Sequence, residues 1–233
     1  MIEAVVFDMD GVLFDTERIS CECCFETARK MGLVMTEEAV YGSCGRNEAA
    51  VREHVIRSLE PWYPGGSFPY DAYREQLEAL FCARLEEELP VMKGVRELLA
   101  FLKERKLKTA VASSTVVSRV RSHLKRSGLE SYFDAVIGGD MIQASKPAPD
   151  IYLAACRALG VSPQNAMGVE DSVNGIRAVA AAGMTAVMIP DMVQPDGEIR
   201  KVYDYCFPSL VELREAMERG EIYRTRRKII KED

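Results

Sequence analysis

Val5-Val6-Phe7-Asp8-Met9-Asp10-Gly11-Val12-Leu13 is the stretch of this sequence that decides the fold. It begins as an apolar, β-branched run, which is typical of a parallel strand buried on both faces. Because residues two apart along an extended chain point the same way, the carboxylates of Asp8 and Asp10 are predicted to converge at the carboxyl end of that strand. In open α/β sheets ligands bind at this edge. Two convergent anions repel each other, so the arrangement predicts a bound cation, a shared proton, or both.

The composition is that of an ordinary soluble globular protein. The chain has 233 residues, of which 48% are hydrophobic and 28% charged, enough for one large domain or two modest ones. A net charge of −6 disfavours nonspecific nucleic-acid binding. The sequence has no signal-peptide pattern and no apolar run long enough to span a bilayer. We therefore expect a cytoplasmic protein with neither a nucleic-acid nor a membrane partner.

The seven cysteines form no disulfide framework, because their number is odd and their spacings match none. Cys21, Cys23 and Cys24 lie close together and could belong to a soft-metal site, but no fourth ligand is near in sequence. We expect reduced thiols. His54 and His123 fall in helical patterns, where packing or surface roles are expected for both.

Apolar runs and helical patterns alternate through most of the chain. Four further runs predict strands, at residues 109–112, 135–137, 166–169 and 185–189. Helical patterns lie between these runs or precede them, and Thr115 is the predicted N-cap of one such helix. This alternation predicts an α/β fold with a mostly parallel, Rossmann-like sheet covered on both faces.

The segment from residue 16 to residue 90 differs, because it has no strand pattern. Residues 17–31, 47–59 and 70–88 are predicted helices. The sequence thus predicts a helical cap domain, residues 16–90, inserted into an α/β core domain formed by residues 1–15 and 91–233. Such an insert can act as a lid or as a fixed appendage. A monomer is expected, because lid motion does not require a partner chain.

Polar residues follow the later strands at the same predicted edge. Ser113-Ser114-Thr115 stands at a helix N-terminus, where backbone N–H groups and a hydroxyl suit a phosphate. Lys146, held before a proline, could offset phosphate or carboxylate charge. Glu170 and Asp171 again place acids after an apolar run. Each of these features alone is ordinary for a cap, a surface lysine or a helix start.

Taken in order, these residues resemble the four motifs of the haloacid dehalogenase (HAD) superfamily of phosphotransferases. The matching positions are Asp8-Met9-Asp10-Gly11-Val12, Ser113, Lys146 and Glu170-Asp171. Their flanks, residues 14–17, 146–150 and 170–175, resemble the branch with a helical cap that contains small-metabolite phosphatases and β-phosphoglucomutase. The resemblance runs from residue 2 to about residue 215.

The resemblance implies a mechanism for the core residues. Asp8 would attack phosphorus and form an aspartyl-phosphate. Asp10 would protonate the leaving alcohol and then deprotonate the attacking water. Ser113, the backbone N–H of Ser114, and Lys146 would hold the phosphoryl oxygens.

The resemblance also implies a metal cofactor and substrate contacts in the cap. Mg²⁺ would be held by Asp8, the backbone carbonyl of Asp10, and Asp171, with Glu170 binding directly or from just outside the coordination sphere. Residues 42–47 resemble the substrate-specificity loop of the family. Arg46 is its candidate anion ligand, although a surface arginine at a helix start is an open alternative. Thr16 and Asn47 are further candidate substrate-binding residues.

A phosphatase acting on a small phosphorylated metabolite, a sugar phosphate by class, is the favoured function. The alternative is a β-phosphoglucomutase-type phosphotransferase, but mutases of the family carry a cap lysine beside the sugar phosphate. Lys30 is the only lysine between Asp15 and Pro90, roughly 20 Å along a helix from Asp15. Dehalogenases of the family lack the acid that Asp10 supplies. A non-enzymatic phosphometabolite-binding regulator is a third possibility.

The basic tail, residues 223–231, lies beyond the fold pattern. It could bind an acidic partner or RNA, or it could be a frayed or surface-packed terminus.

Overall fold

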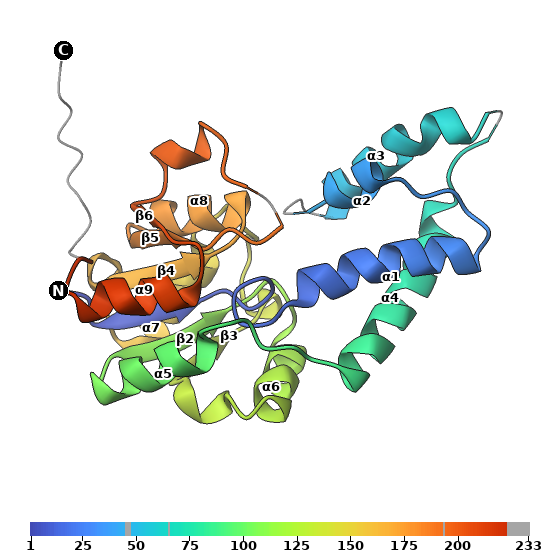
Figure 1. Cartoon of the computed structure of the whole chain (residues 1–233). Coiled ribbons are helices and arrows are strands. Elements are labelled where there is room, and N and C mark those ends of the chain that lie inside the picture. The colour runs from blue at the N-terminus through green and yellow to red at the C-terminus, as the bar shows by residue number, and fades with distance from the viewer. Residues whose placement is uncertain (45–47, 65, 193, 223–233) are drawn as a thin grey trace, which may run out of the picture. The chain divides into compact units, whose positions relative to one another are not determined.

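The computed structural model describes residues 1–44, 48–64, 66–192 and 194–222 (Figure 1). The chain divides into two compact units: Met1–Phe14 with Val91–Asp233, here called the α/β unit, and Asp15–Pro90, here called the helical unit. The predicted fold class is confirmed, because the α/β unit contains a parallel sheet with helices packed on it. Arg46, Asn47 and the basic tail lie outside the described residues.

The sheet has six strands, and every neighbouring pair runs parallel. The strands are β1 (Ala4–Phe7), β2 (Lys108–Ala112), β3 (Ala135–Ile137), β4 (Ala166–Glu170), β5 (Thr185–Met188) and β6 (Tyr205–Cys206). Their order, β3-β2-β1-β4-β5-β6, reverses direction between β1 and β4. In such sheets the crevice outside the carboxyl ends at the reversal point is where ligands bind. Asp8 follows β1 and Glu170 ends β4, so both acids stand at that point.

The α/β unit contains five α-helices and four short 3₁₀ helices among its described residues. The α-helices are α5 (Val95–Glu104), α6 (Val117–Arg126), α7 (Asp150–Leu159), α8 (Val173–Ala181) and α9 (Leu210–Glu218). The 3₁₀ helices are η2 (Glu130–Tyr132), η3 (Gly139–Met141), η4 (Pro163–Asn165) and η5 (Ile199–Lys201).

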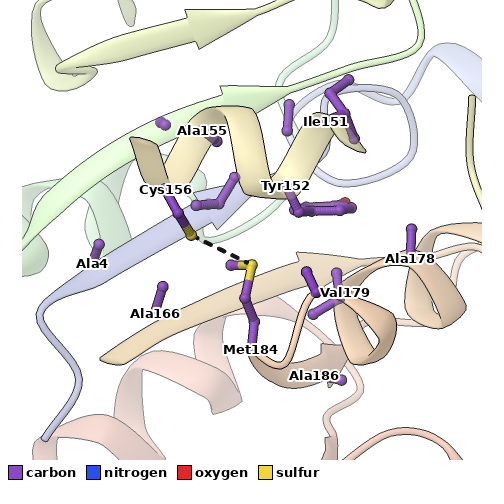
Figure 2. Packing of buried hydrophobic residues seen from close by; sticks show 14 of the residues in the cluster. Ala4, Ile151, Tyr152, Ala155, Cys156, Ala166, Ala178, Val179, Met184 and Ala186 are labelled. Atoms are coloured by element: carbon purple, nitrogen blue, oxygen red, sulfur yellow. Dashed lines mark hydrogen bonds between the residues drawn. The ribbon is translucent and has the colours of Figure 1, made fainter. Parts of the chain in front are cut away.

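Helices α7 and α8 cover one face of the sheet. Their apolar side chains join those of alternate strand residues in one buried cluster (Figure 2). Ala4 and Ala166 are both fully buried there, and such small strand residues leave room for bulkier helix residues such as Tyr152. Within the cluster the thiol of Cys156 donates to Sδ of Met184 at 3.8 Å. Packing of this kind holds α7, and with it Tyr152, against the strands that carry the acids.

Helices α5 and α9 pack against each other on the other side of the sheet from α7 (Figure 1). Strand β1 lies between these helices and α7. Its residues Val5 and Phe7 are fully buried because both faces of the strand are covered. Burial on both faces explains why β1 is a continuous apolar run rather than an alternating one.

The helical unit has its own apolar core. It contains α1 (Thr16–Lys30), α2 (Glu37–Tyr41), α3 (Glu48–Leu59), η1 (Glu60–Trp62) and α4 (Tyr70–Glu87). Helices α1 and α4 pack along each other, and the hydroxyl of Tyr73 donates to the carbonyl of Cys24 at 3.1 Å. The core is built from both helices together with α3 and the aromatic ring of Phe68.

The structure corrects several element predictions. Thr115 is not the N-cap of α6: Val116 takes that position without a side-chain cap. Helix α2 and strand β6 were not predicted, because five and two residues are too few to show a period. Helices α7 and α9 were also not predicted. Among the described residues, no helix is both long and apolar enough to cross a membrane.

Candidate active site

Asp8 lies at the centre of the candidate site. Strand pairing continues one residue past β1, because the backbone N–H of Asp8 donates to the carbonyl of Val169 at 2.9 Å. This bond fixes the backbone from which the carboxylate projects. The residue is only 7% exposed, and its Oδ1 accepts a hydrogen bond from Nζ of Lys146 at 2.5 Å. A buried acid in direct contact with a lysine is thus the first element of the site.

Lys146 joins three strand ends through one ammonium group. Its Nζ donates to Asp8, to Oε1 of Glu170 at 2.6 Å, and to the carbonyl of Ala112 at 3.2 Å. The ammonium also lies 5.2 Å from the ring centroid of Tyr152. Since an ammonium has three N–H donors, the three hydrogen bonds use all of them. The lysine is therefore held at one position between β1, β2 and β4.

Glu170 is fully buried and receives hydrogen bonds on both oxygens. Oε1 accepts from Lys146 and from the hydroxyl of Tyr152, the latter at 2.6 Å. Oε2 accepts from the hydroxyl and the backbone N–H of Ser172, at 3.1 and 3.3 Å. Four donors surround this carboxylate, so it is held rigidly and in turn holds Lys146 in place.

Two glycines allow the acids to come this close. A methyl group at Gly175 would lie 1.9 Å from Cδ of Glu170, so helix α8 can pack here only without a side chain. A methyl group at Gly11 would lie 2.4 Å from Oδ2 of Asp171, and Gly11 has a φ of +78°. Glycine is required at both positions for steric reasons.

The residues present fit a hard divalent cation. One carboxylate oxygen from each of Asp8, Glu170 and Asp171 lies within 4.8 Å of the others, and this is the single group of three or more such ligands in the described part of the chain. Carboxylate oxygens are the ligands that Mg²⁺ and Ca²⁺ prefer. Three carboxylates against the one charge of Lys146 leave an excess of negative charge that a cation would neutralise. The donor set therefore suits a metal ion of this class.

The pKa of Asp8 is raised to about 7: burial is the largest cause, the charge of Lys146 opposes it, and the charges of Glu170 and Asp10 add to the rise. A cation beside Asp8 would favour the ionised carboxylate. Burial alone would lower the pKa of Lys146, but the charges of Asp8 and Glu170 outweigh it and leave that pKa above its ordinary value. The lysine therefore stays protonated in the site.

Asp10 and the segment after β2 are linked through Thr115. The hydroxyl of Thr115 donates to Oδ2 of Asp10 at 3.2 Å, and its backbone N–H donates to Oγ of Ser113 at 3.1 Å. Helix α6 begins at Val117, whose N–H donates to Oδ1 of Asp140 at 2.8 Å, so Asp140 and not Thr115 receives the first N–H of the helix. Ser113 is fully buried, whereas Ser114 is exposed.

The structure thus brings together most of the predicted core residues. Asp8, Lys146, Glu170 and Asp171 form one cluster, and Asp10 and Ser113 share Thr115 as a hydrogen-bonding partner. Thr16 is the buried first residue of α1 in the helical unit. The predicted roles of Thr16, Arg46 and Asn47 in substrate binding stay predictions.

Two residues of the site were missed from the sequence. Ser172 directly follows Glu170-Asp171 and could have been recognised as the cap of α8, since its Oγ accepts from the N–H of Gly175 at 3.0 Å. Tyr152 gave no signal, because a tyrosine in an apolar helical segment is more often a packing residue. Its contact with Glu170 depends on how α7 crosses the sheet.

Known proteins are similar to this chain over most of its length. A family model described as "Hydrolase: haloacid dehalogenase-like hydrolase" matches residues 2–183. A phosphorylated carbohydrates phosphatase of Thermotoga maritima is 34% identical, over 80% of this chain and 84% of the relative. Hexitol phosphatase B of Escherichia coli is 29% identical, over 81% of this chain and 84% of the relative.

A solved structure is similar over nearly the whole chain. The crystal structure of a protein described as a putative β-phosphoglucomutase from Thermotoga maritima has a TM-score of 0.76 and 28% sequence identity. The match covers 94% of this chain and 99% of that one.

Proposed function

The chain belongs to the haloacid dehalogenase-like hydrolase family and is a phosphatase, and from this premise we propose that it hydrolyses a small phosphorylated metabolite in a Mg²⁺-dependent reaction. The proposed reaction proceeds through an aspartyl-phosphate on Asp8. The observation that carries the proposal is the cluster of Asp8, Lys146, Glu170 and Asp171 at the point where the strand order reverses.

Asp8 is the proposed nucleophile. Its carboxylate oxygen forms a bond to phosphorus while the bond from phosphorus to the alcohol oxygen breaks. Asp10, two residues on and held by Thr115, is the proposed general acid that protonates the leaving alcohol. In the second step Asp10 takes a proton from water, which attacks phosphorus and releases inorganic phosphate and Asp8.

Lys146 and the segment after β2 are the proposed phosphate-binding groups. The positive charge of Lys146, 2.5 Å from Asp8, would stabilise negative charge on the transferring phosphoryl oxygens. Ser113 and the backbone N–H of Ser114 would bind the other oxygens. Glu170 and the carbonyl of Ala112 would keep Lys146 in place while the N–H group that now donates to Asp8 turns to a phosphoryl oxygen.

Asp8, Asp171 and the backbone carbonyl of Asp10 are the residues proposed to hold Mg²⁺. Glu170 already accepts hydrogen bonds from Lys146, Tyr152 and Ser172, which favours a position just outside the coordination sphere. A bound Mg²⁺ would neutralise charge on the phosphoryl group.

A phosphorylated sugar or polyol is the proposed substrate. This class is supported by the printed names of the relatives, which include a phosphorylated carbohydrates phosphatase and a hexitol phosphatase. Arg46, Thr16 and Asn47 are proposed to contact it from the helical unit, which we propose serves as a cap. Action as a monomer in the cytoplasm is part of the same proposal.

A mutase is the second candidate, since a structural relative is described as a putative β-phosphoglucomutase. The chain lacks a favourable cap lysine for that reaction. Lys30, the only lysine in the helical unit, is at the last turn of α1, where its Nζ lies 2.8 Å from Glu26. Incubation with β-glucose 1-phosphate and a bisphosphate primer separates the two: stoichiometric glucose 6-phosphate without phosphate release would favour the mutase.

The test of the proposed function is phosphate release from a panel of sugar and polyol phosphates, with and without Mg²⁺. We expect turnover only with the ion, and a loss of at least about a thousandfold in Asp8→Asn. Asp134→Asn is the matched control, because Asp134 is an exposed aspartate just before β3, at the opposite edge of the sheet. Near-normal turnover by Asp8→Asn, or none by the unaltered chain, would contradict the proposal.

A further inference from the structure

Two cysteines of the helical unit lie side by side although they are far apart in sequence. The Sγ atoms of Cys21, on α1, and Cys44, just after α2, are 3.9 Å apart. Neither cysteine is in a disulfide bond in the structure. Cys21 is 7% exposed, whereas Cys44 is half-buried. One thiol of the pair is therefore more accessible to solvent than the other.

We propose that Cys21 and Cys44 are a site of reversible oxidation that forms a disulfide within the helical unit. A disulfide requires the sulfurs to be about 2.05 Å apart. They must therefore approach by roughly 2 Å, a movement that rotation about the Cα–Cβ bonds of two side chains can supply.

Cys24, one turn along α1 from Cys21, also lies near Cys44, since burial and also the charge of Cys44 raise the pKa of Cys24, but the direct Sγ–Sγ contact joins Cys21 and Cys44. Cys23 is fully buried in the apolar core of the helical unit, and two residues along a helix do not face the same way. The thiol of Cys82 donates to Oε1 of Glu78 at 3.4 Å. Cys206 is exposed but belongs to the α/β unit. Within the helical unit, Cys21 and Cys44 are thus the pair placed for a bond.

The pair is not placed as a metal site. In the described part of the chain, the only group of three or more potential ligands close enough to share an ion is Asp8, Glu170 and Asp171. The soft-metal alternative raised by Cys21, Cys23 and Cys24 therefore has no support in the structure. A two-sulfur contact without further ligands is what disulfide formation requires.

A peroxide can supply the oxidation. The Cys44 thiolate attacks one peroxide oxygen, the O–O bond breaks, and the products are a sulfenic acid and, after protonation, water. The sulfur of Cys21 then attacks that of Cys44, the S–O bond breaks, and a second water leaves. Two thiols lose two protons and two electrons, and hydrogen peroxide is reduced to two waters.

Cys44 is assigned the first step because it is the more exposed. The hydrogen bond with Cys44 and burial both raise the pKa of Cys21, which makes Cys21 the poorer initial nucleophile. A dithiol reductant would reverse the bond by thiol–disulfide exchange. Disulfides are rare in reducing compartments, and those that form there are usually transient, as this one would be.

The position of the bond suggests what it would regulate. The disulfide would link α1, through Cys21, to Cys44. Cys44 directly precedes residues 45–47, and Arg46 in that segment is proposed to bind substrate. An effect of oxidation on substrate binding by Arg46 rests on the proposed function, whereas formation of the disulfide does not.

The full-length protein is treated with hydrogen peroxide, alkylated and digested with trypsin without reduction. We expect a mass loss of about 2 Da before alkylation, because two hydrogens leave. The number of titratable thiols under denaturing conditions should fall from seven to five. A linked pair of peptides, residues 19–29 with residues 31–46, should appear and should vanish after treatment with dithiothreitol.

Matched serine variants identify the partners. Cys21→Ser and Cys44→Ser should each abolish the linked pair, whereas Cys24→Ser and Cys206→Ser should retain it. Persistence of the link in Cys21→Ser, oxidation of Cys44 that stops without a link, or linkage only between chains would each overturn the proposal.

Discussion

Lys146 is the residue on which the charge balance of the site depends. Its ammonium lies 2.5 Å from Asp8 and 2.6 Å from Glu170, and its side chain is 8% exposed. Removing one partner from a buried ion pair leaves an uncompensated charge, which costs far more than loss of a surface pair.

Lys146→Met is therefore expected to lower the free energy of unfolding by about 3–5 kcal/mol in the absence of divalent ions. Urea unfolding measures the change. Lys201→Met is the control, because Lys201 pairs with Glu198 on the surface, where both side chains are more than two-thirds exposed. Equal stability of the two variants would show that Lys146 does not neutralise buried carboxylates.

Tyr152 is expected to act on the reaction through Glu170. In Tyr152→Phe one of the four donors to Glu170 is lost, and a hydrogen bond to a charged group contributes about 2 kcal/mol to stability. We expect a loss of that size in urea unfolding and a fall in kcat/KM of about tenfold. Tyr132→Phe, just before β3, should change neither quantity. An unaltered kcat/KM in Tyr152→Phe would remove its positioning role.

The acids could be predicted from the sequence, but the tyrosine could not. Asp8 and Glu170 interrupt apolar runs, and a charged residue in such a place is informative by itself. Tyr152 is one aromatic residue in a helix whose buried side consists of similar apolar residues. Its role emerges only from the packing of α7 on β1, β2 and β3, which brings the hydroxyl of Tyr152 to Glu170 and which no local pattern specifies.

At the scale of elements, helix α8 is fitted to the end of β4. Ser172 caps the helix and also donates to Glu170, so the element that follows the strand fixes the strand's last carboxylate. Gly175, in the first turn, faces that carboxylate.

Gly175→Ala is expected to displace Glu170, because the added methyl group would overlap its carboxyl carbon at 1.9 Å. Overpacking of this kind costs about 1–3 kcal/mol, and turnover should fall with it. Thermal unfolding and phosphatase assays measure the two effects. Gly197→Ala is the control, since nothing lies within 4 Å of a methyl group there. Wild-type stability and activity in Gly175→Ala would contradict the close packing.

The apolar strands β1 to β5 were the predictable elements, whereas the longer helices α7 and α9 were not predicted. The runs at β1, β2, β4 and β5 were recognised because covering both faces demands apolar residues throughout. The N-cap of α6 was predicted wrongly at Thr115, since capping rules consider the local chain and not Asp140, which lies 23 residues after Val117. Tertiary hydrogen bonding overrode the local preference.

At the scale of the whole molecule, ion binding and stability of the α/β unit should be coupled. An ion that binds the folded carboxylates but not the unfolded chain stabilises the fold by about 2.7 kcal/mol at a hundredfold excess over Kd. The acids that would bind it come from two strands separated by more than 160 residues. Only the folded chain brings them together.

Mg²⁺ is therefore expected to raise the Tm of the protein by about 5–10 °C at that excess. Asp171→Asn should lose most of this rise, because it removes one of the three clustered carboxylates. Asp134→Asn should keep it. Calorimetry with and without the ion measures the shift, and an equal rise in all three proteins would place the ion elsewhere.

The most direct test of the central claim is to trap the phosphorylated enzyme. The protein is mixed with a phosphorylated substrate found by the panel and Mg²⁺, quenched in acid within one turnover, and treated with borohydride, which reduces an acyl phosphate to an alcohol. Mass spectrometry of residues 1–18 should then show homoserine in place of Asp8 and aspartate retained at Asp10 and Asp15. Reduction at another residue, or none in a protein that turns over, would contradict the account.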